Sequence, residues 1–473
     1  MAKKVKKESR FKMPSAFSVL LLIIIILSIV TNLIKSDAVK GADLPLVVMS
    51  PILGFVDALD VALFVMIIGG FLGVVTKTDA LQAGISKVVE KLKGKENILI
   101  PVLMFIFSIG GTTYGMAEET IAFYALIVGT MMFAGFDSLT GAAVILLGAG
   151  VGVLGSTVNP FAIGAAIDAL PEGVEVSQAA IIGLGAILWI SSYLIATFFV
   201  MKYAKKVKNK KANSMLSKEE IKASEAVYLK KDEENAEMPK LTGRRQSVLW
   251  IFGFSFVIMI LSLLPWWSFG VEIFNKTTDW LVGIPFGDWY FQELSAWFFL
   301  MAILVGIVYG LKEKEIVDSF VAGAADMMGV ALVIAVSRGI SVIMTETGLG
   351  DYILINAAEA LRGVNSSLFT GLSYFLYLGL SFLIPSTSGL AGASMPIMGG
   401  LTEALQLSPE VMIMIFCSAC GVVNLVTPTS AVVMGGLATS KVEFSTWLKF
   451  VWKVLLSLIV ANIVILSIAM VIL

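Results

Sequence analysis

Long apolar segments dominate the chain, and short polar or basic stretches separate them. Their lengths suit membrane-crossing helices, because about 20 apolar residues span the hydrocarbon core of a bilayer. The pattern therefore predicts an all-α polytopic membrane protein. The apolar segments lie at about 15–34, 58–76, 98–134, 139–167, 178–201, 246–267, 292–310, 329–346, 367–402, 410–440 and 446–472.

Polar residues and glycine interrupt four of these segments. Two re-entrant hairpins are expected, at 98–134 and 367–402, because each has a break rich in Gly, Ser and Thr near its middle. Two broken helices are expected, with their breaks at 156–160 and 424–428. Broken backbone inside a bilayer is tolerated only where protein or a water-filled cavity satisfies its polar groups.

Composition excludes an ordinary soluble protein. The chain is 58% hydrophobic and 15% charged, with a mean hydropathy of +0.91, whereas soluble domains have about 45–50% apolar and about 25% charged residues. The net charge of -1 gives no electrostatic basis for nucleic-acid binding. Histidine is absent, which removes the commonest metal ligand and the usual base near neutral pH. No metal site or cofactor is assigned, and a coupling proton would need Asp, Glu, Lys or Tyr.

The two cysteines and the amino terminus each allow two interpretations. Cys417 and Cys420 form C-x-x-C inside an apolar run, where helix packing is favoured over redox chemistry. The first segment is basic and then apolar, like a secretory signal. No small-residue cleavage site follows it, so we expect a retained first helix.

Basic residues predict the orientation in the membrane. Residues 1–12 contain six Lys or Arg, 77–95 contain five and 202–245 contain thirteen, which is 24 of the 34 in the chain. Such clusters mark the cytoplasmic side, so we expect a cytoplasmic amino terminus in a bacterial-type inner membrane. Alternating crossings then give nine transmembrane helices plus the two hairpins. Residues 202–245 are expected to be a flexible linker, and 79–95 an interfacial amphipathic arm.

The two halves of the chain match one another. Residues 54–81 align with 323–350 without a gap at an offset of 269, with eight identities. Two further matches, both at helix breaks, are 113–120 with 387–394 at offset 274, and 156–160 with 424–428 at offset 268. Three matches in order indicate a duplication, and the alternating topology predicts that the copies are inverted, as in secondary transporters. The expected parts are a first repeat (1–201), the linker (202–245), an extra linking helix (246–267) and a second repeat (268–473).

The four breaks are the candidate binding site. Half-helix N-termini offer N–H donors to a carboxylate, and freed carbonyls with side-chain oxygens suit Na⁺ or an ammonium group. The alternative is a set of kinks sealed by Ser and Thr without a ligand, but two symmetric pairs of breaks favour a site. The candidates are Thr112, Thr113, Tyr114, Gly115, Ser156, Thr157, Asn159, Ser386, Thr387, Ser388, Asn424, Thr427 and Thr429, with Na⁺ near Asn159 and Asn424.

Charged residues inside the apolar segments are further candidates. Glu118 and Glu119 follow the first hairpin tip, where the matched residues of the second copy are Gly392 and Ala393. A carboxylate at that depth costs its helix about 2.5–3.5 kcal/mol, which suggests a chemical role with a cationic amine or a carried proton. The alternative is an internal ion pair with Arg338.

Arg338 lies mid-segment, opposite Gly69 of the first copy. It could hold a substrate carboxylate bidentately or only neutralise a glutamate, and both interpretations stay open. Asp57, Asp60 and Asp326 lie near segment entrances and are expected to be helix-start residues. Lys77 and Glu346 are expected to be interfacial. These residues are assigned no direct contact with substrate.

Three stretches carry a family resemblance: F-L-G-V-V-T-K-T (71–78), G-T-T-Y-G-M-A-E-E-T-I-A-F-Y (111–124) and P-S-T-S-G-L-A-G-A-S-M-P-I-M-G-G-L (385–401). They resemble the YfcC-type branch of the C4-dicarboxylate carrier-like family, in the ion transporter superfamily, and the resemblance extends over the chain outside the linker. It implies a scaffold domain, a transport domain holding both hairpins, a homodimer and elevator-like movement. Ala122 departs from the branch pattern, where Pro is expected, whereas Pro396 holds the equivalent place in the second hairpin.

The resemblance also implies substrates. Members of the branch are described as basic amino acid antiporters, including arginine/ornithine exchangers, and cousins carry C4-dicarboxylates. We expect secondary transport of an amine-bearing amino acid, with Glu118 and Glu119 holding the amine and helix N-termini or Arg338 holding the carboxylate. The first rival is a Na⁺- or H⁺-coupled dicarboxylate carrier clamped by Arg338. Paired hairpins disfavour a channel or a membrane scaffold, and the lack of His, of a nucleotide motif and of a Ser/His/Asp set disfavours an enzyme.

Overall fold

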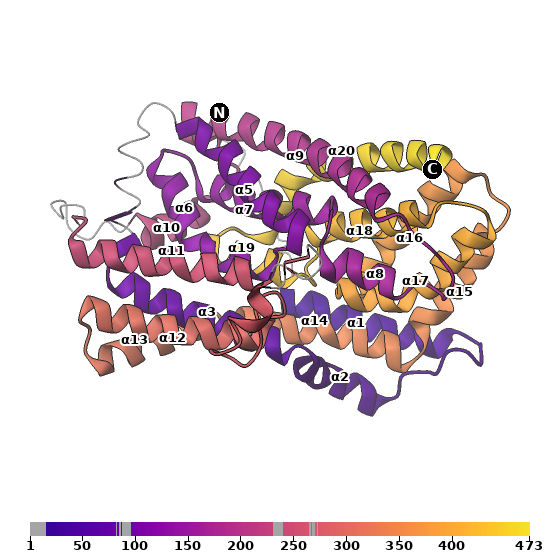
Figure 1. The fold of residues 1–473 in the computed structure, drawn as a ribbon, viewed down its shortest axis with the longest axis horizontal. Helices are drawn as coiled ribbons and strands as arrows, with labels where there is room; N and C mark the ends of the chain where they lie inside the picture. Colours follow the sequence, from indigo (N-terminus) through magenta and orange to yellow (C-terminus); the bar gives the residue numbers. More distant parts are fainter. Residues whose placement is uncertain are drawn as a thin grey trace, which may run out of the picture.

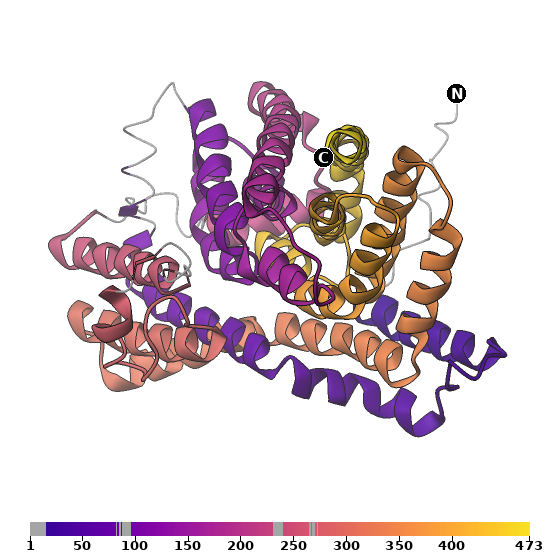
Figure 2. The same cartoon turned by 45° about the vertical axis from the view of Figure 1, so that its right-hand side comes forward.

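The computed structural model describes residues 16–81, 83–84, 87, 96–229, 240–263, 266, 270–271 and 273–473. Over these residues the regular structure is helical, with no strand, and the predicted all-α class is confirmed. The helices form two layers: α1–α3 and α12–α14 lie along one side of the molecule, with α11 beside them, and the remaining long helices lie on the other side (Figures 1 and 2).

The first layer comprises α1 (Ala16–Leu33), α2 (Leu44–Asp57), α3 (Leu59–Lys77), α11 (Gly243–Leu263), α12 (Phe291–Tyr309), α13 (Glu313–Asp326) and α14 (Met328–Glu346). The second layer comprises α5 (Leu99–Tyr114), the 3₁₀ helix η2 (Glu118–Phe123), α6 (Tyr124–Phe133), α7 (Ser138–Leu154), the π-helix η3 (Pro160–Gly164), α8 (Ala165–Asp168), α9 (Gln178–Asn209), α15 (Leu349–Leu361), α16 (Ser366–Leu383), α17 (Thr387–Ala404), α18 (Pro409–Asn424), α19 (Ala431–Ser440) and α20 (Phe444–Ile472).

Seven helices in the described part of the chain are long and apolar enough to cross a membrane, or eight if the bent pair α13–α14 forms one span. The sequence pattern predicts nine crossings. The two counts differ in their members. Of the nine predicted crossings, α1, α7 and α18 are shorter apolar helices and α14 counts only within the bent pair, whereas α5 and α16, predicted as hairpin arms, are long enough. α7 and α18 stop at the predicted breaks after 17 and 16 residues, short of the ~20 residues that one crossing needs.

Two matching helix pairs form the centre of the first layer. α2 and α3 are 14 and 19 residues long and are separated by Ala58, while α13 and α14 have the same two lengths and are separated by Met327. Each helix in the second pair begins and ends 269 residues after its counterpart in the first pair, which is the offset that aligns 54–81 with 323–350. α3 packs against α13, and α2 packs against α14. A side chain on Gly69 or Gly323 would strike the facing backbone, so the axes approach closely.

Sequence patterns missed α2, α13 and α15. Two prolines interrupt the apolar run of α2, at its start and at Pro51. The sequence of α13 mixes acidic and basic residues with apolar ones, and α15 carries Asp351 and Glu359. α2 is apolar but, at 14 residues, too short for a membrane span. The charged residues lower the hydropathy of α13 and α15, although tertiary packing makes each segment helical.

The second layer repeats one packing scheme. In the first half α5, α6 and α9 pack around α7; in the second half α16, α17 and α20 pack around α18. Both central helices are apolar on all sides and almost wholly buried. They cross where Gly421 lies against Leu154 and Leu425 lies against Gly150. The breaks at the ends of α7 and α18 are therefore brought to the centre of the protein.

The expected flexible linker is folded in its first part. α9 continues to Asn209, and α10 (Lys218–Tyr228) follows with a capping box from Ser217. Its Glu220 is 4% exposed and accepts hydrogen bonds from Glu443 N (2.7 Å) and Thr446 Oγ1 (3.2 Å). The prediction of flexibility is thus wrong for this part, because α10 has its own caps and docks on the turn between α19 and α20. The predicted arm at 79–95 lies largely outside the described residues.

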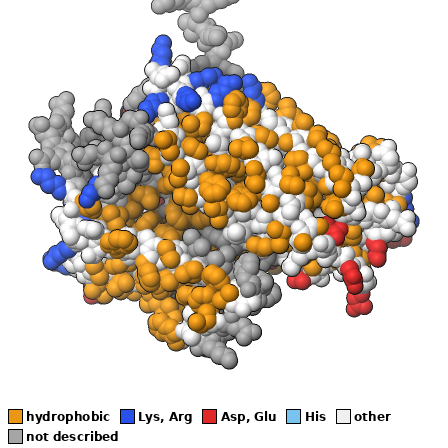
Figure 3. Space-filling view, turned by 45° about the horizontal axis from the view of Figure 1, so that its top comes forward, with side chains coloured by type: hydrophobic (Ala, Val, Ile, Leu, Met, Phe, Trp, Pro, Cys, Tyr) orange, Lys and Arg blue, Asp and Glu red, His pale blue; other side chains and the backbone are white. Residues whose placement is uncertain are grey.

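Apolar side chains cover the flank of the molecule, between Lys and Arg at one end and Asp and Glu at the other (Figure 3). On α20 the exposed stripe is Trp452, Leu456, Val460, Val464 and Ile468, each more than half exposed. A stripe with this four-residue spacing on one helix face suits lipid as its neighbour.

Candidate functional site

All four predicted breaks meet at one cavity of about 180 Å³, which we call the central cavity. Its polar lining comes from both hairpin tips, from both broken helices and from the first layer. Of the predicted site residues, those that line it are Gly115, Asn159, Arg338, Ser386, Thr387, Ser388, Asn424 and Thr429. The volume is below the ~300–1,000 Å³ of drug-sized pockets, so the central cavity suits a small solute.

The first hairpin tip is joined to the break after α7. Thr112 Oγ1 donates to Gly155 O (2.7 Å), and Thr157 N donates to Thr112 O (2.9 Å). α5 then ends at Gly115, which has φ 82° and lies where a Cβ would be 2.7 Å from the Asn159 amide. Only glycine fits both the left-handed conformation and this close approach.

Asn159 organises the broken helix itself. Its side chain is 2% exposed; Nδ2 donates to Ser156 Oγ (3.0 Å), and Oδ1 accepts from Phe161 N (3.0 Å). The amide therefore satisfies backbone N–H groups at the start of the π-helix, as a capping residue does. Ser156 Oγ in turn donates to Val153 O (2.7 Å).

Two helix N-termini open onto the central cavity from the second half. Ser386 caps α17 by accepting from Gly389 N (3.2 Å), and Ser430 caps α19 by accepting from Val433 N (3.4 Å). Thr427 and Thr429 share a hydrogen bond of 2.7 Å in the turn before α19. Helix N-termini carry partial positive charge and free N–H donors, so this side of the cavity favours an anionic group.

Helix C-termini open onto the same cavity. α5 ends next to Gly115, and α18 ends at Asn424, and both of these residues line the cavity. Helix C-termini carry partial negative charge. The central cavity thus presents both polarities, which a solute with a carboxylate and an amine would complement.

Arg338 reaches the central cavity from α14 in the first layer. Its Nε lies 3.8 Å from Asp57 Oδ2, and the two side chains are 25% and 59% exposed. An ion pair this long and this exposed is weak, so the guanidinium remains accessible to a solute. The prediction that Asp57 starts a helix is wrong, because it is the last residue of α2 and faces Arg338.

Of the other two aspartates predicted to start helices, one does so and one does not. Asp60 lies in the first turn of α3, as predicted, and accepts from Gln292 Nε2 (3.2 Å). Asp326 is the last residue of α13, so its prediction as a helix-start residue is also wrong. Both errors have one cause: the apolar pattern does not reveal α2 and α13, so it places their final residues at the start of the helices that follow.

Several predicted site residues are not among those that line the cavity. Thr112, Ser156, Thr157 and Thr427 hold the breaks together through the hydrogen bonds above, and Thr113 Oγ1 donates to Ile109 O (2.7 Å) within α5. The backbone of Tyr114, Glu118 and Glu119 is placed at the first tip, while their side chains lie outside the described residues. Cys417 and Cys420 are both buried and unpaired, in agreement with a packing role.

The helix boundaries change one part of the repeat alignment. The ends of α5 and α16, and the starts of η2 and α17, are related by the same offset as the helix pairs of the first layer. Thr387 and Ser388 therefore correspond to Glu118 and Glu119, whereas the sequence match at 113–120 places Gly392 and Ala393 opposite them. The two tips thus differ in carrying acids in one copy and hydroxyls in the other.

The cavity also has an aromatic wall that the sequence pattern does not reveal. Tyr290 and Phe291, at the start of α12, line it together with Phe161, and the Phe161 and Tyr290 rings lie 5.3 Å apart. Tyr290 begins a helix without a break, so no pattern distinguished it from an ordinary membrane-interface aromatic. The one available signal was a Tyr followed by a capping-box Glu293.

A polytopic helical protein whose broken helices converge on one polar cavity belongs to the class of membrane transporters. The chain belongs to the DcuC family, described as C4-dicarboxylate anaerobic carrier, whose family model matches residues 28–471. This finding confirms the resemblance inferred from the sequence and indicates a transporter rather than an enzyme.

Proteins similar to this chain include two bacterial relatives and one solved transporter structure. An uncharacterized protein of Haemophilus influenzae is 30% identical over 402 residues, covering 84% of this chain and 73% of its own. The Escherichia coli protein named "Putative basic amino acid antiporter YfcC" is 27% identical over 403 residues, covering 83% and 74%. The Alcanivorax borkumensis YdaH transporter structure is 14% identical with a TM-score of 0.46, covering 96% of this chain and 98% of that one.

Proposed function

We propose that this protein is a secondary active transporter that exchanges amino acids with a cationic side chain. The observation that carries the proposal is the double polarity of the central cavity, where two helix N-termini and two helix C-termini meet around Arg338. An α-carboxylate would bind the N-termini of α17 and α19 and the guanidinium of Arg338. An α-amine would bind the carbonyl ends of α5 and α18.

The cationic side chain would be held by Glu118 and Glu119. Their backbone directly follows Met116 and Ala117, which line the central cavity. Two adjacent carboxylates in a membrane are costly, and a basic amino acid supplies the matching charge. The similarity to a protein named as a basic amino acid antiporter also supports this substrate class.

A C4-dicarboxylate carrier coupled to Na⁺ or H⁺ is the second candidate. The family description favours it. So does the composition of the cavity, because Arg338 is the charged side chain among the described lining residues. Two carboxylates would then divide between Arg338 and the helix N-termini, and a coupling Na⁺ would bind near Asn159 or Asn424.

For the mechanism, we propose that the two halves are inverted repeats and that the second layer moves against the first as an elevator. The matched packing of α2–α3 and α13–α14, and the matched pairings around α7 and α18, support the duplication. Both hairpin tips belong to the second layer, so its movement would carry the solute past Arg338. A homodimer in a bacterial inner membrane, with a cytoplasmic amino terminus, completes the proposal.

Counterflow in liposomes tests the substrate class. Purified protein is reconstituted into liposomes loaded with arginine or ornithine, and uptake of external labelled arginine is measured. Liposomes loaded with succinate or fumarate are the comparison, and uptake of labelled succinate or fumarate is measured in the same way. Saturable counterflow of arginine supports the proposal and excludes a channel. Uptake of succinate or fumarate without amino acid exchange would overturn it in favour of the dicarboxylate carrier.

The role of the glutamates is tested in the same assay. Glu118→Gln and Glu119→Gln are expected to lower arginine transport at least tenfold, which corresponds to ~1.4 kcal/mol or more of lost binding. Glu172→Gln, in an exposed loop, is the matched control and should transport normally. If adding Arg338→Gln restored transport to either variant, the glutamate would be only an ion-pair partner.

A further inference from the structure

A second cavity of about 810 Å³ lies between the two layers, at the end of the molecule where the linker docks. One wall is formed by α3 and α13, from Gly69 to Lys77 and from Ser319 to Asp326. The other wall is formed by α6, α19 and the end of α10. We call this cavity the linker-side vestibule. It carries charges of both signs, including Lys77, Asp326 and Lys441.

α3 and α19 run past both cavities. α3 contributes Val61 to the central cavity and Gly69 to the vestibule, and α19 contributes Val432 to the central cavity and Ala438 to the vestibule. With a rise of 1.5 Å per residue, these intervals are about 12 Å and about 9 Å. The two cavities therefore lie one behind the other, with a short barrier between them.

Apolar side chains from both layers form that barrier. Ala58 and Val65 from the first layer pack with Ile121 and Ala431 from the second, each at most 8% exposed. Val61 and Met327 pack at the edges of this cluster. Val61 and Ala431 also line the central cavity, and Met327 also lines the vestibule, so the cluster borders both. Such an apolar seam excludes water, and it would separate in the proposed movement of the layers.

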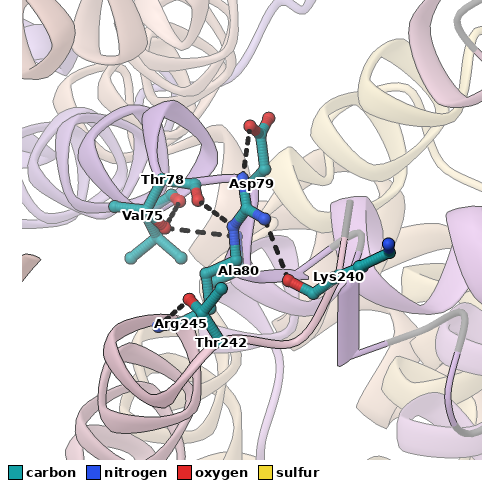
Figure 4. Close-up of polar contacts among 7 residues, drawn as sticks. All are labelled: Val75, Thr78, Asp79, Ala80, Lys240, Thr242 and Arg245. Atoms are coloured by element: carbon teal, nitrogen blue, oxygen red, sulfur yellow. Dashed lines mark hydrogen bonds and ion pairs between the residues drawn. The ribbon is translucent and has the colours of Figure 1, made fainter. Parts of the chain in front are cut away.

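The mouth of the vestibule is framed by hydrogen bonds from the folded ends of the linker. On one wall, Arg245 donates to Thr78 O (3.0 Å) and Lys240 O (2.9 Å) and pairs with Asp79 Oδ2 (3.1 Å), as Figure 4 shows. On the other wall, Tyr228 Oη donates to Thr439 O (2.7 Å).

Burial raises the pKa of Tyr228, so its hydroxyl stays a hydrogen-bond donor over the physiological pH range. Each wall of the mouth is thus tied to one end of the linker by contacts that involve no barrier residue.

We propose that the linker-side vestibule is the aqueous route between the central cavity and the linker side of the membrane. Val65 and Ile121 form the barrier that closes this route in the present conformation. The inference deepens the proposed transport function, but its test uses thiol accessibility and needs no transported substrate. Failure of the transport assay and failure of this assay are therefore separate results.

The test uses single cysteines in a Cys417→Ala/Cys420→Ala background. Ala322→Cys reports on the vestibule, Val432→Cys reports on the central cavity, and Leu456→Cys on the lipid-facing stripe of α20 is the unreactive control. A charged, membrane-impermeant methanethiosulfonate is added to spheroplasts and to inverted vesicles. We expect rapid modification of Ala322→Cys from the linker side alone and slow modification of Val432→Cys from that side.

The barrier is then opened by truncation. Val65→Ala and Ile121→Ala should each raise the linker-side modification rate of Val432→Cys at least tenfold. Val75→Ala, on the same helix as Val65 and equally buried but outside the barrier, should leave the rate unchanged. Size-exclusion chromatography of each variant shows whether it is monodisperse and therefore folded. If one truncation misfolds, the modification rate in the other truncation tests the barrier.

Three results would overturn the proposal. The first is Ala322→Cys reacting from the opposite side only, and the second is its reacting only with an apolar maleimide, which would identify a lipid-filled crevice. The third is a Val432→Cys rate that Val65→Ala and Ile121→Ala leave unchanged.

Discussion

The two halves of this transporter share a backbone plan but differ where they meet the central cavity. At the first hairpin tip, η2 begins with Glu118 and Glu119; at the second, α17 begins with Thr387 and Ser388. On the first layer, Arg338 takes the place that Gly69 has in the other half, where Gly323 and Met327 fill the Cβ position. The proposed duplication would supply a scaffold with matched breaks, and the departures from symmetry would supply the charges that select a solute.

The largest expected effect tests the close packing of the first half. α5 and α7 cross where a Cβ on Gly152 would lie 2.8 Å from Thr112 N and 2.9 Å from the Gly111 Cα. Gly152→Leu should destabilise the protein by about 3 kcal/mol or more, because backbone cannot move aside for the side chain. Thermal unfolding in detergent measures the loss.

A glycine of the second half supplies the control. Gly392, in α17, has open space at its Cβ position, so Gly392→Ala should be neutral or stabilising by about 0.4–1 kcal/mol. Equal losses for Gly152→Leu and Gly392→Ala would show that this crossing does not limit stability.

The next effect concerns Arg338, which has no counterpart in the first half. Removing a bidentate charged partner costs about 1.5–3 kcal/mol, so Arg338→Gln should lower kcat/KM for the transported solute about 10–100-fold. Arg338→Lys should restore little, because lysine lacks the planar fork. Counterflow kinetics in liposomes measure both variants.

Asp57→Asn distinguishes solute binding from ion pairing at Arg338. Because the Arg338–Asp57 contact is 3.8 Å long and partly exposed, its loss should change kcat/KM less than threefold. A loss as large as that of Arg338→Gln would mean that the pair itself, rather than contact with the solute, is what transport requires.

How far the sequence predicts this structure depends on the kind of signal. Gly, Ser, Thr and Pro inside apolar runs predicted the breaks at Ser156 and Asn424, because irregular backbone in a membrane needs polar residues around it. Seven of the proposed site residues line the central cavity for that reason, and Arg338, an eighth, was indicated by its charge inside an apolar segment. Tyr290 could not be found in this way, since its place on the cavity depends on how α12 packs against the second layer, and that is tertiary information.

A smaller effect on stability is expected from the hydrogen bonds at the two helix breaks, which differ between the halves. In the first half, Thr112 Oγ1 and Thr157 Oγ1 each donate to the backbone across the break, to Gly155 O and Thr112 O. In the second half, the hydrogen bond between Thr427 and Thr429 stays within one turn. Thr112→Val and Thr157→Val should each cost about 1 kcal/mol in stability.

These threonine variants should also be non-additive, because Thr112 and Thr157 are direct neighbours with a hydroxyl separation of 3.3 Å. Thr427→Val, tested by the same melting experiment, should show no coupling to Thr157→Val. Full additivity of Thr112→Val and Thr157→Val would contradict the idea that the hairpin tip and the break unfold together.

The smallest effect contrasts two fully buried tyrosines. Tyr377, on α16, donates to Ser394 Oγ (3.1 Å), whereas the Tyr124 hydroxyl, at the start of α6, has no hydrogen-bond partner among the described residues and lies against Gly436. Tyr377→Phe should cost about 0.5–1.5 kcal/mol, the usual net value of one hydrogen bond. Tyr124→Phe should be neutral or slightly stabilising, because it removes a buried polar group without breaking a bond. Melting temperatures of the two variants, measured side by side, decide this. A destabilised Tyr124→Phe would mean that its hydroxyl is satisfied in solution by a bound water or solute, which would make this seam between α6 and α19 polar rather than dry.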